Sequence, residues 1–284
     1  MKKAIMIIQC QDQRGIVAAV SDFLFAHYGN ILEIDQHVDQ ESGMFFMRAA
    51  WELETFSLPE EHILPTFELA IGKKFGMKHQ LYIENKKPKM ALFVSKQSHC
   101  LFDVLSRHYS GQFQVEIPFV LSNHETLRPI VEAFGIPFHH IPVLSGEKEV
   151  AEAEQLALLA EHQVDFIVLA RYMQVLSEDF VSRYPNKIIN IHHSFLPAFV
   201  GAKPYHAAYE RGVKIIGATA HYVTAVLDAG PIIEQDVARV RHHNTISDLV
   251  QIGQDVEKVV LSKAIKYHLE RKVLPVGNKT VIFY

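Results

Sequence analysis

The sequence predicts an α/β protein of two domains: a small α+β domain followed by a larger domain with a mostly parallel sheet. Residues 4–84 contain the element order β-α-β-β-α-β, which is the split βαβ arrangement of ferredoxin-like domains. The charged, proline-bearing run 85–89 is typical of a linker. Residues 90–284 then contain near-continuous apolar strands separated by helical segments, as expected for parallel strands covered on both faces. The predicted domains are therefore 1–84 and 90–284.

The first half of the small domain is predicted from apolar spacing. An apolar strand at 4–9 precedes a helix, and Gly29 follows that helix as a left-handed C′ glycine would. Apolar and polar residues alternate along 45–53, which predicts a strand with one buried face. Residues 31–38 are its expected hairpin partner.

The second half of the small domain is predicted from capping and breaking residues. Ser57 and Glu60 have the spacing of a capping box that opens a second helix. Pro65 is expected to distort this helix, and Gly76 to close it. Leu81 and Ile83 then alternate with polar residues in a final strand.

The strands of the larger domain are predicted from short apolar runs, and a loop is expected to join the last two of these strands. After them, Thr245 is expected to cap a long amphipathic helix. The predicted strands are 90–94, 115–121, 166–170, 187–191, 215–223 and 231–240.

Composition narrows the classes of partner. The chain is 49% apolar and 21% charged, with a net charge of −4 and no block of basic residues. Nucleic acids and membrane surfaces leave a basic footprint, so we expect a small-molecule ligand instead. The N-terminus lacks the cleavage site of a signal peptide, and two cysteines make no disulfide framework. These features together favour the cytoplasm.

Asn190 and His192 are the first candidate catalytic residues. They stand two positions apart at the carboxyl end of a predicted strand, so both point to one face while Ile191 points to the core. An amide donor beside an imidazole suits an oxygen that becomes negative when a carbonyl is attacked. Asp228, in an Asp-Ala-Gly turn, is the carboxylate expected to orient His192 and to move a proton.

Two longer stretches carry a family resemblance. "NIHHSFLPAF" and the later "GATAHYVTAVLDAGPIIEQ" resemble the motifs of the folate-dependent formyltransferases. The resemblance implies a 10-formyltetrahydrofolate substrate and the catalytic trio Asn190, His192 and Asp228. It also implies that no metal or other cofactor is required.

The same resemblance suggests where the folate binds. The stretch 169–177 is similar to the family's folate-pocket segment, and His221 matches a recurrent histidine that either reaches the site or only supports the Asp228 loop. For Met173, Val175 and Leu176, burial in the core is the alternative. The predicted substrate-binding residues are Arg171, Met173, Val175, Leu176, His221 and Val223.

Two departures choose between branches of this family. Phosphoribosylglycinamide formyltransferases place a glycine-containing loop after their first strand to receive a phosphate, whereas 95–100 here has no glycine. "DQRGIVAAVSDFLFAHYGNI" resembles ACT amino-acid-sensing domains. With "GAKPYHAAYERGVK", these features resemble the formyltetrahydrofolate deformylases. The implied reaction is hydrolysis of 10-formyltetrahydrofolate to tetrahydrofolate and formate, which links one-carbon balance to purine synthesis; the alternative is transfer to an amine such as phosphoribosylglycinamide.

The ACT resemblance implies regulation and a homo-oligomer. Glycine and methionine are the expected effectors, and Asp12, Gly15, Ile16 and Asn30 are their candidate binding residues. The alternative is that Asp12 caps a helix, Asn30 lies in a turn, and the domain only joins subunits.

Two rival functions remain. The seventeen histidines of the chain suggest a metal-dependent hydrolase as an alternative, with ligands among His192, His193, His206 and Asp228. Two observations disfavour it: adjacent histidines on a strand face opposite ways, and no His-Glu-x-x-His motif is present. Outside this metal hypothesis, Lys203 is a less certain contact of the loop after the Asn-x-His motif, and Gly201 is expected to shape that loop. A folate-binding scaffold without activity is the second rival, and the presence of the full trio disfavours it.

Overall fold

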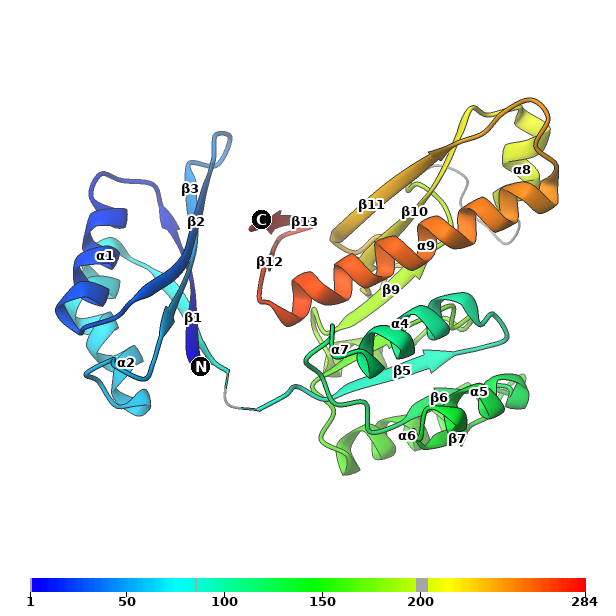
Figure 1. Ribbon diagram of the computed structural model, residues 1–284, viewed down its shortest axis with the longest axis horizontal. Coiled ribbons are helices and arrows are strands. Elements are labelled where there is room, and N and C mark those ends of the chain that lie inside the picture. The colour runs from blue at the N-terminus through cyan, green and yellow to red at the C-terminus, as the bar shows by residue number, and fades with distance from the viewer. Residues whose placement is uncertain (1, 85, 198–203) are drawn as a thin grey trace. The chain divides into compact units, whose positions relative to one another are not determined.

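The computed structural model describes residues 2–84, 86–197 and 204–284, which divide into two compact units (Figure 1). The first unit comprises Met1–Lys86 together with Val281–Tyr284, and the second comprises Lys87–Thr280. The last four residues therefore group with the first unit, whereas the sequence suggested one continuous second domain to residue 284.

The first unit is a four-stranded antiparallel sheet with helices, in the strand order β2-β3-β1-β4. This order and the sequence of elements are those expected for a split βαβ unit. The elements are β1 (Lys3–Gln11), α1 (Ile16–Ala26), β2 (Ile31–Asp39), β3 (Met44–Glu52), α2 (Glu60–Phe67), the π-helical η1 (Glu68–Gly72), α3 (Lys73–Phe75) and β4 (Lys78–Ile83).

The end of α1 and the burial of β3 differ from the expectation. Tyr28, not Gly29, is left-handed, with φ of 59°. Gly29 is instead required for close approach, because a Cβ there would lie 3.0 Å from the carbonyl oxygen of Leu24. Strand β3 is buried on both faces, and Arg48 within it pairs with Glu33 at 2.6 Å.

The start of α2 also differs. The predicted capping box at Ser57 and Glu60 is not formed. Pro59 is the N-cap and no side chain caps the helix. The Oγ of Ser57 instead lies 3.1 Å from Nδ1 of His27. Pro65 lies inside α2, and the departure from α-helical geometry begins only at Glu68, where η1 starts. Gly76 closes the helical region in the left-handed conformation, as predicted.

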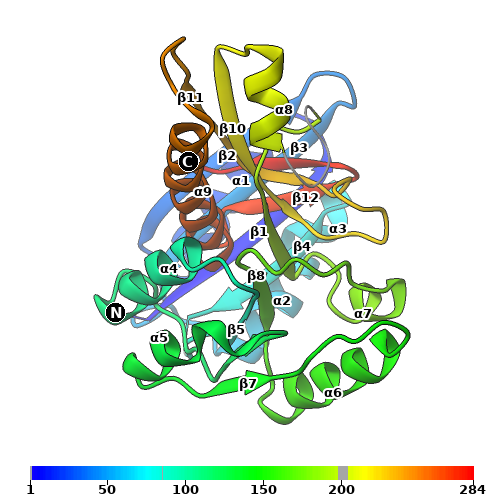
Figure 2. The same cartoon turned by 90° about the vertical axis from the view of Figure 1, so that its right-hand side faces the viewer.

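The second unit contains a seven-stranded sheet in the order β11-β10-β9-β8-β5-β6-β7 (Figure 2). Strands from β9 to β7 are parallel, and β10 and β11 are antiparallel additions at one edge. The predicted strand 115–121 is much shorter, at 120–122. The elements are β5 (Met90–Val94), α4 (His99–Tyr109), β6 (Val120–Ser122), η2 (Glu125–Leu127), α5 (Arg128–Ala133), β7 (Phe138–His140), α6 (Lys148–Glu161), β8 (Phe166–Leu169), α7 (Glu178–Arg183), β9 (Ile188–His192), α8 (Pro204–Arg211), β10 (Ile215–Tyr222), β11 (Ile232–Arg239), α9 (Ile246–Leu269) and β12 (Val273–Val276). Strand β13 (Lys279–Ile282) pairs with β12, and the division between the two units falls within it, after Thr280.

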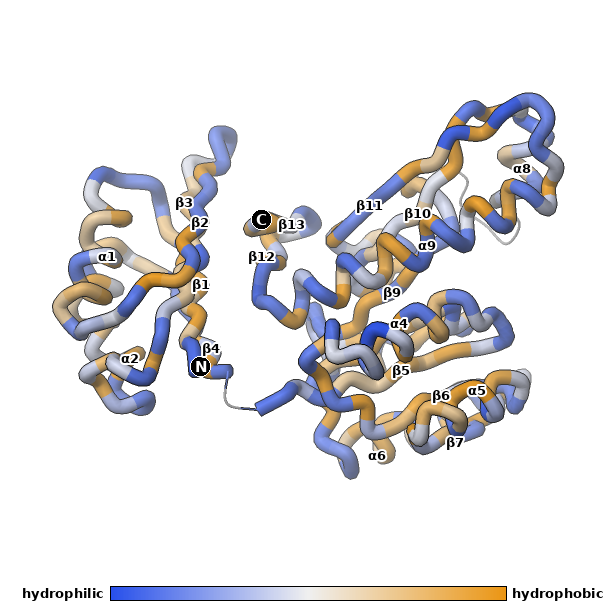
Figure 3. The backbone as a smooth tube through the Cα atoms, viewed as in Figure 1, coloured by the Kyte–Doolittle hydropathy of each residue, from blue (hydrophilic) through white to orange (hydrophobic). Residues whose placement is uncertain are grey.

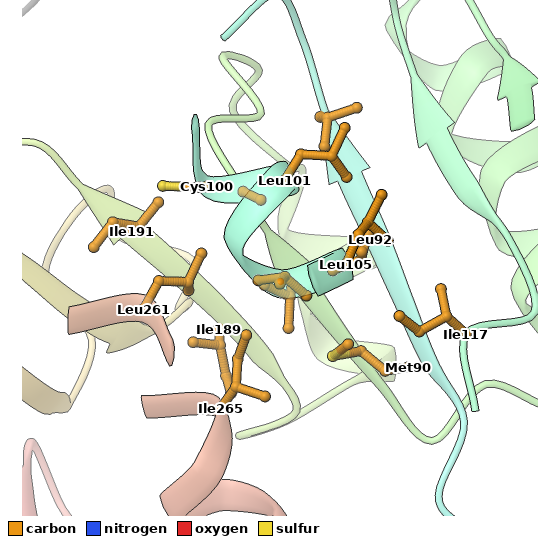
Figure 4. Packing of buried hydrophobic residues seen from close by; sticks show 14 of the residues in the cluster. Met90, Leu92, Cys100, Leu101, Leu105, Ile117, Ile189, Ile191, Leu261 and Ile265 are labelled. Atoms are coloured by element: carbon orange, nitrogen blue, oxygen red, sulfur yellow. The ribbon is translucent and has the colours of Figure 1, made fainter. Parts of the chain in front are cut away.

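Helices cover both faces of this sheet, as the apolar strands predicted. Met90 and Leu92 of β5 pack into a core with α4 and α9 (Figure 4), whereas Ala91 and Phe93 pack on the opposite face with α6 and α7. The edge strand β11 is largely hydrophilic, in contrast to the hydrophobic β5 (Figure 3). Burial on both faces fixes the inner strands, so their carboxyl ends form a rigid edge.

Thr245 caps α9 as predicted, within a capping box that includes Asp248. Both cysteines, Cys10 and Cys100, are free and buried. In the described part of the chain, no helix has both the length and the apolarity of a membrane span.

Candidate active site

The end of strand β9 places Asn190 and His192 together, as alternation predicted. Ile191 between them packs into the core at 3% exposure, while His192 is buried at the strand's end. Strand β10 pairs with β9 so that His221 lies directly opposite Asn190. Directly opposed residues of an antiparallel pair have adjacent side chains. The site is thus built on two rigid strands.

His221 lies between Asn190 and the carboxylate of Asp228. A bulge between Ala220 and His221 shifts the register with β11 at this point, and bulges of this kind re-aim side chains. Nδ1 of His221 lies 2.9 Å from the carbonyl oxygen of Tyr222, so Nδ1 carries a proton. Nε2 lies 3.2 Å from Nδ2 of Asn190. This contact uses one N–H of the Asn190 amide and leaves the other for a ligand.

Asp228 completes the predicted trio. Its Oδ2 lies 3.3 Å from Nδ1 of His192, and its Oδ1 lies 3.6 Å from Nε2 of His221. Asp228 is left-handed, with φ of 52°, a conformation that aspartate adopts more readily than most residues. The hydrogen bond from His192, followed by the contact with His221, holds the pKa of Asp228 well below its ordinary value. The carboxylate is therefore ionised, and its Oδ2 accepts a hydrogen bond from the Nδ1–H of His192.

The loop that carries Asp228 depends on Gly230. A Cβ at Gly230 would overlap the carbonyl oxygen of Tyr222. The same Tyr222 backbone pairs with Pro231, whose carbonyl accepts its N–H at 2.9 Å. Only glycine allows the loop to return this closely to β10, and the return sets the position of Asp228.

The Nε2 atom of His192 is available to contact a ligand. With Nδ1 directed at Asp228, Nε2 is buried and has no hydrogen-bond partner among the described residues. A buried imidazole nitrogen normally has a partner. Nε2 of His192 and the free N–H of Asn190 are therefore the groups available to a reacting carbonyl.

The segment after β9 is tied down by residues that the sequence analysis missed. Thr219 Oγ1 donates to the carbonyl of Ser194 at 2.9 Å and accepts from the N–H of Leu196 at 3.1 Å. Nε2 of Gln235 donates to the same hydroxyl at 2.9 Å. A polar pair facing inward on two adjacent strands was the available sequence clue.

Ser95 positions the segment that resembles a folate pocket. Its hydroxyl donates to Oδ1 of Asn123 at 2.7 Å and accepts from the N–H of Met173 at 3.0 Å. Met173 and Val175 expose 54% and 56% of their surface, so they are not core residues. Leu176 is a core residue.

The other predicted substrate contacts are less exposed. Val223 is half-buried against the same core as Leu176, and His221 is 2% exposed. The side chain of Arg171 is 13% exposed and lies 3.5 Å from Glu257 through Nη1. His221 therefore supports the trio, and the guanidinium of Arg171 is engaged within the protein.

The residues proposed for a metal site do not form one group. His206 is exposed on α8, and Lys203 and Gly201 lie outside the described residues. Adjacent His192 and His193 do not face opposite ways as a continued strand would require, because β9 ends at His192 and their ring centroids are 5.2 Å apart. Within the described ranges, the group that has metal-ligand spacing consists of His99, Cys100 and Glu257.

The candidate effector residues lie around the start of α1 and β2. Gly15 is the left-handed N-cap of α1, and no side chain caps the helix, so Asp12 does not act as a cap. Asp12 and Asn30 are exposed, whereas Ile16 is 2% exposed in the core of the first unit.

Comparisons with known proteins show which proteins the chain resembles. A family model described as formyl transferase matches residues 88–265. A formyltetrahydrofolate deformylase from Synechocystis sp. is 49% identical over 99% of this chain and 98% of its own length.

Solved structures extend the likeness to the fold. A formyltetrahydrofolate deformylase from Pseudomonas syringae pv. tomato is 48% identical, with a TM-score of 0.96 over 100% of this chain and 95% of that one. Glycinamide ribonucleotide transformylase 1 from Symbiobacterium toebii is 27% identical, with a TM-score of 0.68, and covers 72% of this chain and 98% of its own. The chain belongs to the formyltetrahydrofolate deformylase family, with a formyl transferase domain at residues 88–265.

Proposed function

We propose that this protein hydrolyses 10-formyltetrahydrofolate to tetrahydrofolate and formate. The observation that carries the proposal is the trio itself: Asp228 holds Nδ1 of His192, and Nε2 of His192 is left buried beside Asn190 without a protein partner among the described residues. Near full-length identity of 49% to a deformylase supports water, rather than an amine, as the acceptor.

In the proposed mechanism, the formyl carbonyl oxygen faces Asn190 and His192. Water attacks the formyl carbon, and negative charge develops on this oxygen. The free N–H of Asn190 and a protonated Nε2 of His192 stabilise the charge, as donors aimed at an oxyanion do. The ionised Asp228 accepts the hydrogen bond of Nδ1 and so directs Nε2 of His192 toward this oxygen.

Proton transfer completes the reaction. The attacking water loses a proton, and the departing N10 nitrogen gains one when the C–N bond breaks. Asp228 is the carboxylate positioned to take the first proton, and His192 is the acid positioned to deliver the second. These steps use protein groups and water, so the proposal includes no metal or other cofactor.

The folate is proposed to bind along the segment after β8. Exposed Met173 and Val175 supply apolar surface for its ring system. Backbone groups of Arg171 and Leu176, whose side chains are engaged elsewhere, are the proposed polar contacts. Val223 and His221 line the side nearest the trio.

The first unit is proposed to be an ACT-like regulatory domain that binds glycine or methionine and joins subunits of a homo-oligomer. Exposed Asp12, Gly15 and Asn30 supply a backbone turn and polar atoms for an amino acid. Ile16, being in the core, contributes through its backbone. A cytoplasmic location and a role in balancing one-carbon units for purine synthesis fit this proposal.

The proposal is tested by measuring formate release from 10-formyltetrahydrofolate with and without phosphoribosylglycinamide. We expect formate to appear at the same rate in both reactions. Consumption that strictly requires the amine would identify a transferase instead, and no consumption in either reaction would identify a scaffold.

A further inference from the structure

A buried ion-pair cluster lies near the trio and has no role in the mechanism above. We call Glu257, Arg171, His99 and Tyr205 the Glu257 cluster. Glu257 comes from α9, and its side chain is 1% exposed. Its Oε2 lies 2.7 Å from Nε2 of His99 and 3.5 Å from Nη1 of Arg171, and its Oε1 accepts from the hydroxyl of Tyr205 at 2.6 Å.

The cluster reaches the catalytic imidazole through one side chain. The ring of His193 has its centroid 5.2 Å from that of His192 and 6.2 Å from that of Tyr205. Burial, followed by the charge of Arg171, lowers the pKa of His193 to about 4. The cluster is therefore close enough to the trio to form a wall of the same site.

Keeping these residues together costs stability. A buried ion pair is seldom more stabilising than apolar residues of the same volume. Arg171 is left-handed, with φ of 64°, a backbone conformation that is unfavourable for a residue with a side chain. Gly253 has no room for a Cβ because the ring of Tyr205 occupies that space. Costly features of this kind gather at functional sites.

The two sides of the site differ in openness. Met173, Val175 and Leu227 expose 54%, 56% and 62% of their surface. In contrast, Glu257 and Tyr205 expose 1% and 8%. A folate needs the open apolar surface. The buried side chains of the Glu257 cluster offer no comparable surface, and an amine acceptor has several heavy atoms in addition to its nitrogen.

We propose that the Glu257 cluster determines acceptor specificity by closing the site to amines, so that water attacks the formyl carbon. Nε and Nη1 of Arg171 are buried donors without a hydrogen-bond partner among the described residues, and such donors suit a water molecule. This inference rests on the hydrolytic function proposed above. It assigns the choice of acceptor to residues that do not belong to the trio.

The two possible reactions differ only in the nucleophile. In both, the bond from the formyl carbon to N10 breaks, and N10 takes a proton. Water forms a C–O bond and yields formate. An amine forms a C–N bond and yields a formamide, with the proton that the amine loses balancing the one that N10 gains.

The test removes both charges of the cluster together. Arg171→Gly suits the left-handed backbone, and Glu257→Gln keeps an acceptor for Tyr205 without leaving a buried unpaired charge. Purified protein receives 10-formyltetrahydrofolate and glycinamide, and formate and N-formylglycinamide are both measured. We expect wild-type protein to form formate only. In the double variant we expect the ratio of formamide to formate to rise by about tenfold or more above the wild-type detection limit.

Control measurements distinguish a failure of this inference from a failure of the variant to fold and from a failure of the proposed function. Arg183→Ala, which breaks an exposed ion pair of α7, should keep the wild-type product ratio. If the double variant does not fold, Arg171→Gly alone decides the question. A folded variant that still releases formate with an unchanged ratio overturns the inference, as does wild-type protein that formylates glycinamide equally well. Wild-type protein that releases no formate overturns the proposed function instead.

Discussion

Nδ1 of His192 lies 3.3 Å from Oδ2 of Asp228, although the first residue ends β9 and the second follows β10. The contact fixes which nitrogen of the imidazole is left for the substrate. An ionised carboxylate is only an acceptor, so Nδ1 must carry a proton and Nε2 must face the reacting group. The catalytic direction of His192 is thus a property of the Asp228 loop.

Replacement of Asp228 by Asn should abolish most turnover. Asparagine tolerates the left-handed backbone at this position, so the loop should keep its shape. The variant loses the negative charge that accepts the hydrogen bond of His192 and the carboxylate that is proposed to take a proton from water. We expect kcat to fall by about 100- to 10,000-fold, as measured by formate release, with folate binding retained.

The matched control is Asp179→Asn, at an exposed aspartate of α7 that pairs with Arg183. We expect wild-type kcat from this control. A near-normal kcat in Asp228→Asn would remove Asp228 from the catalytic trio.

Replacement of Asn190 by Leu should lower kcat more than it changes KM. The free N–H of the amide is proposed to bind an oxygen that is fully charged only in the transition state. Loss of one such donor typically costs about 100- to 1,000-fold in kcat. Steady-state kinetics measure the changes in kcat and KM separately, and Asn278→Leu, at an exposed position between β12 and β13, is the control. A rise in KM with unchanged kcat would place Asn190 in ground-state binding instead.

Replacement of Gly230 by Ala should damage both stability and activity. The added methyl group would overlap the Tyr222 carbonyl, so the Asp228 loop must move away from β10. We expect a loss of about 1–3 kcal/mol in the free energy of unfolding, measured by urea titration, together with a large fall in kcat. Gly146→Ala adds a methyl group where no other atom lies within 4 Å, so this control should keep the wild-type kcat. An unchanged kcat in Gly230→Ala would show that the overlap is relieved without moving the loop.

The trio was predictable because it depends on local pattern and on a recognisable motif. Alternation along β9 brings Asn190 and His192 to one face whatever the surrounding fold. Asp228 was expected to orient His192 from its place in an Asp-Ala-Gly turn, and the family resemblance implied the same trio. Its hydrogen-bond geometry required the structure.

Glu257 shows why the rest of the site was not predictable. Its position on α9 falls on the buried face with Gly253 and Leu261, and an acid among such positions was the one available clue. Its partners come from α4, α8 and the segment after β8. Spacing within one helix cannot identify partners on three other segments. Ser57 shows the opposite failure. Its spacing to Glu60 fits a capping box, but in the structure its hydroxyl contacts His27 instead of capping the helix.

Two buried imidazoles should make the protein less stable as the solution becomes mildly acidic. Burial lowers the pKa of His268 to about 3 and that of His193 to about 4, from an ordinary value of 6.5. As pH falls below 6.5, the unfolded chain binds protons at these positions while the folded protein does not. Stability is therefore lost from about pH 6.5 downward, until the folded-state pKa values are reached.

His268→Gln should weaken this pH dependence. Each imidazole that stays neutral only in the folded state costs about 2 kcal/mol between pH 6.5 and 5. Glutamine does not titrate and can still accept a hydrogen bond from the hydroxyl of Tyr222, which lies 2.8 Å from Nδ1 of His268. We therefore expect the difference in unfolding free energy between pH 7 and pH 5, measured by urea titration, to be smaller in the variant by about 2 kcal/mol. His206→Gln, at an exposed histidine of α8, should keep the wild-type difference. If His268→Gln also keeps it, His268 is protonated in the folded protein at pH 5, and the loss of stability must come from other groups.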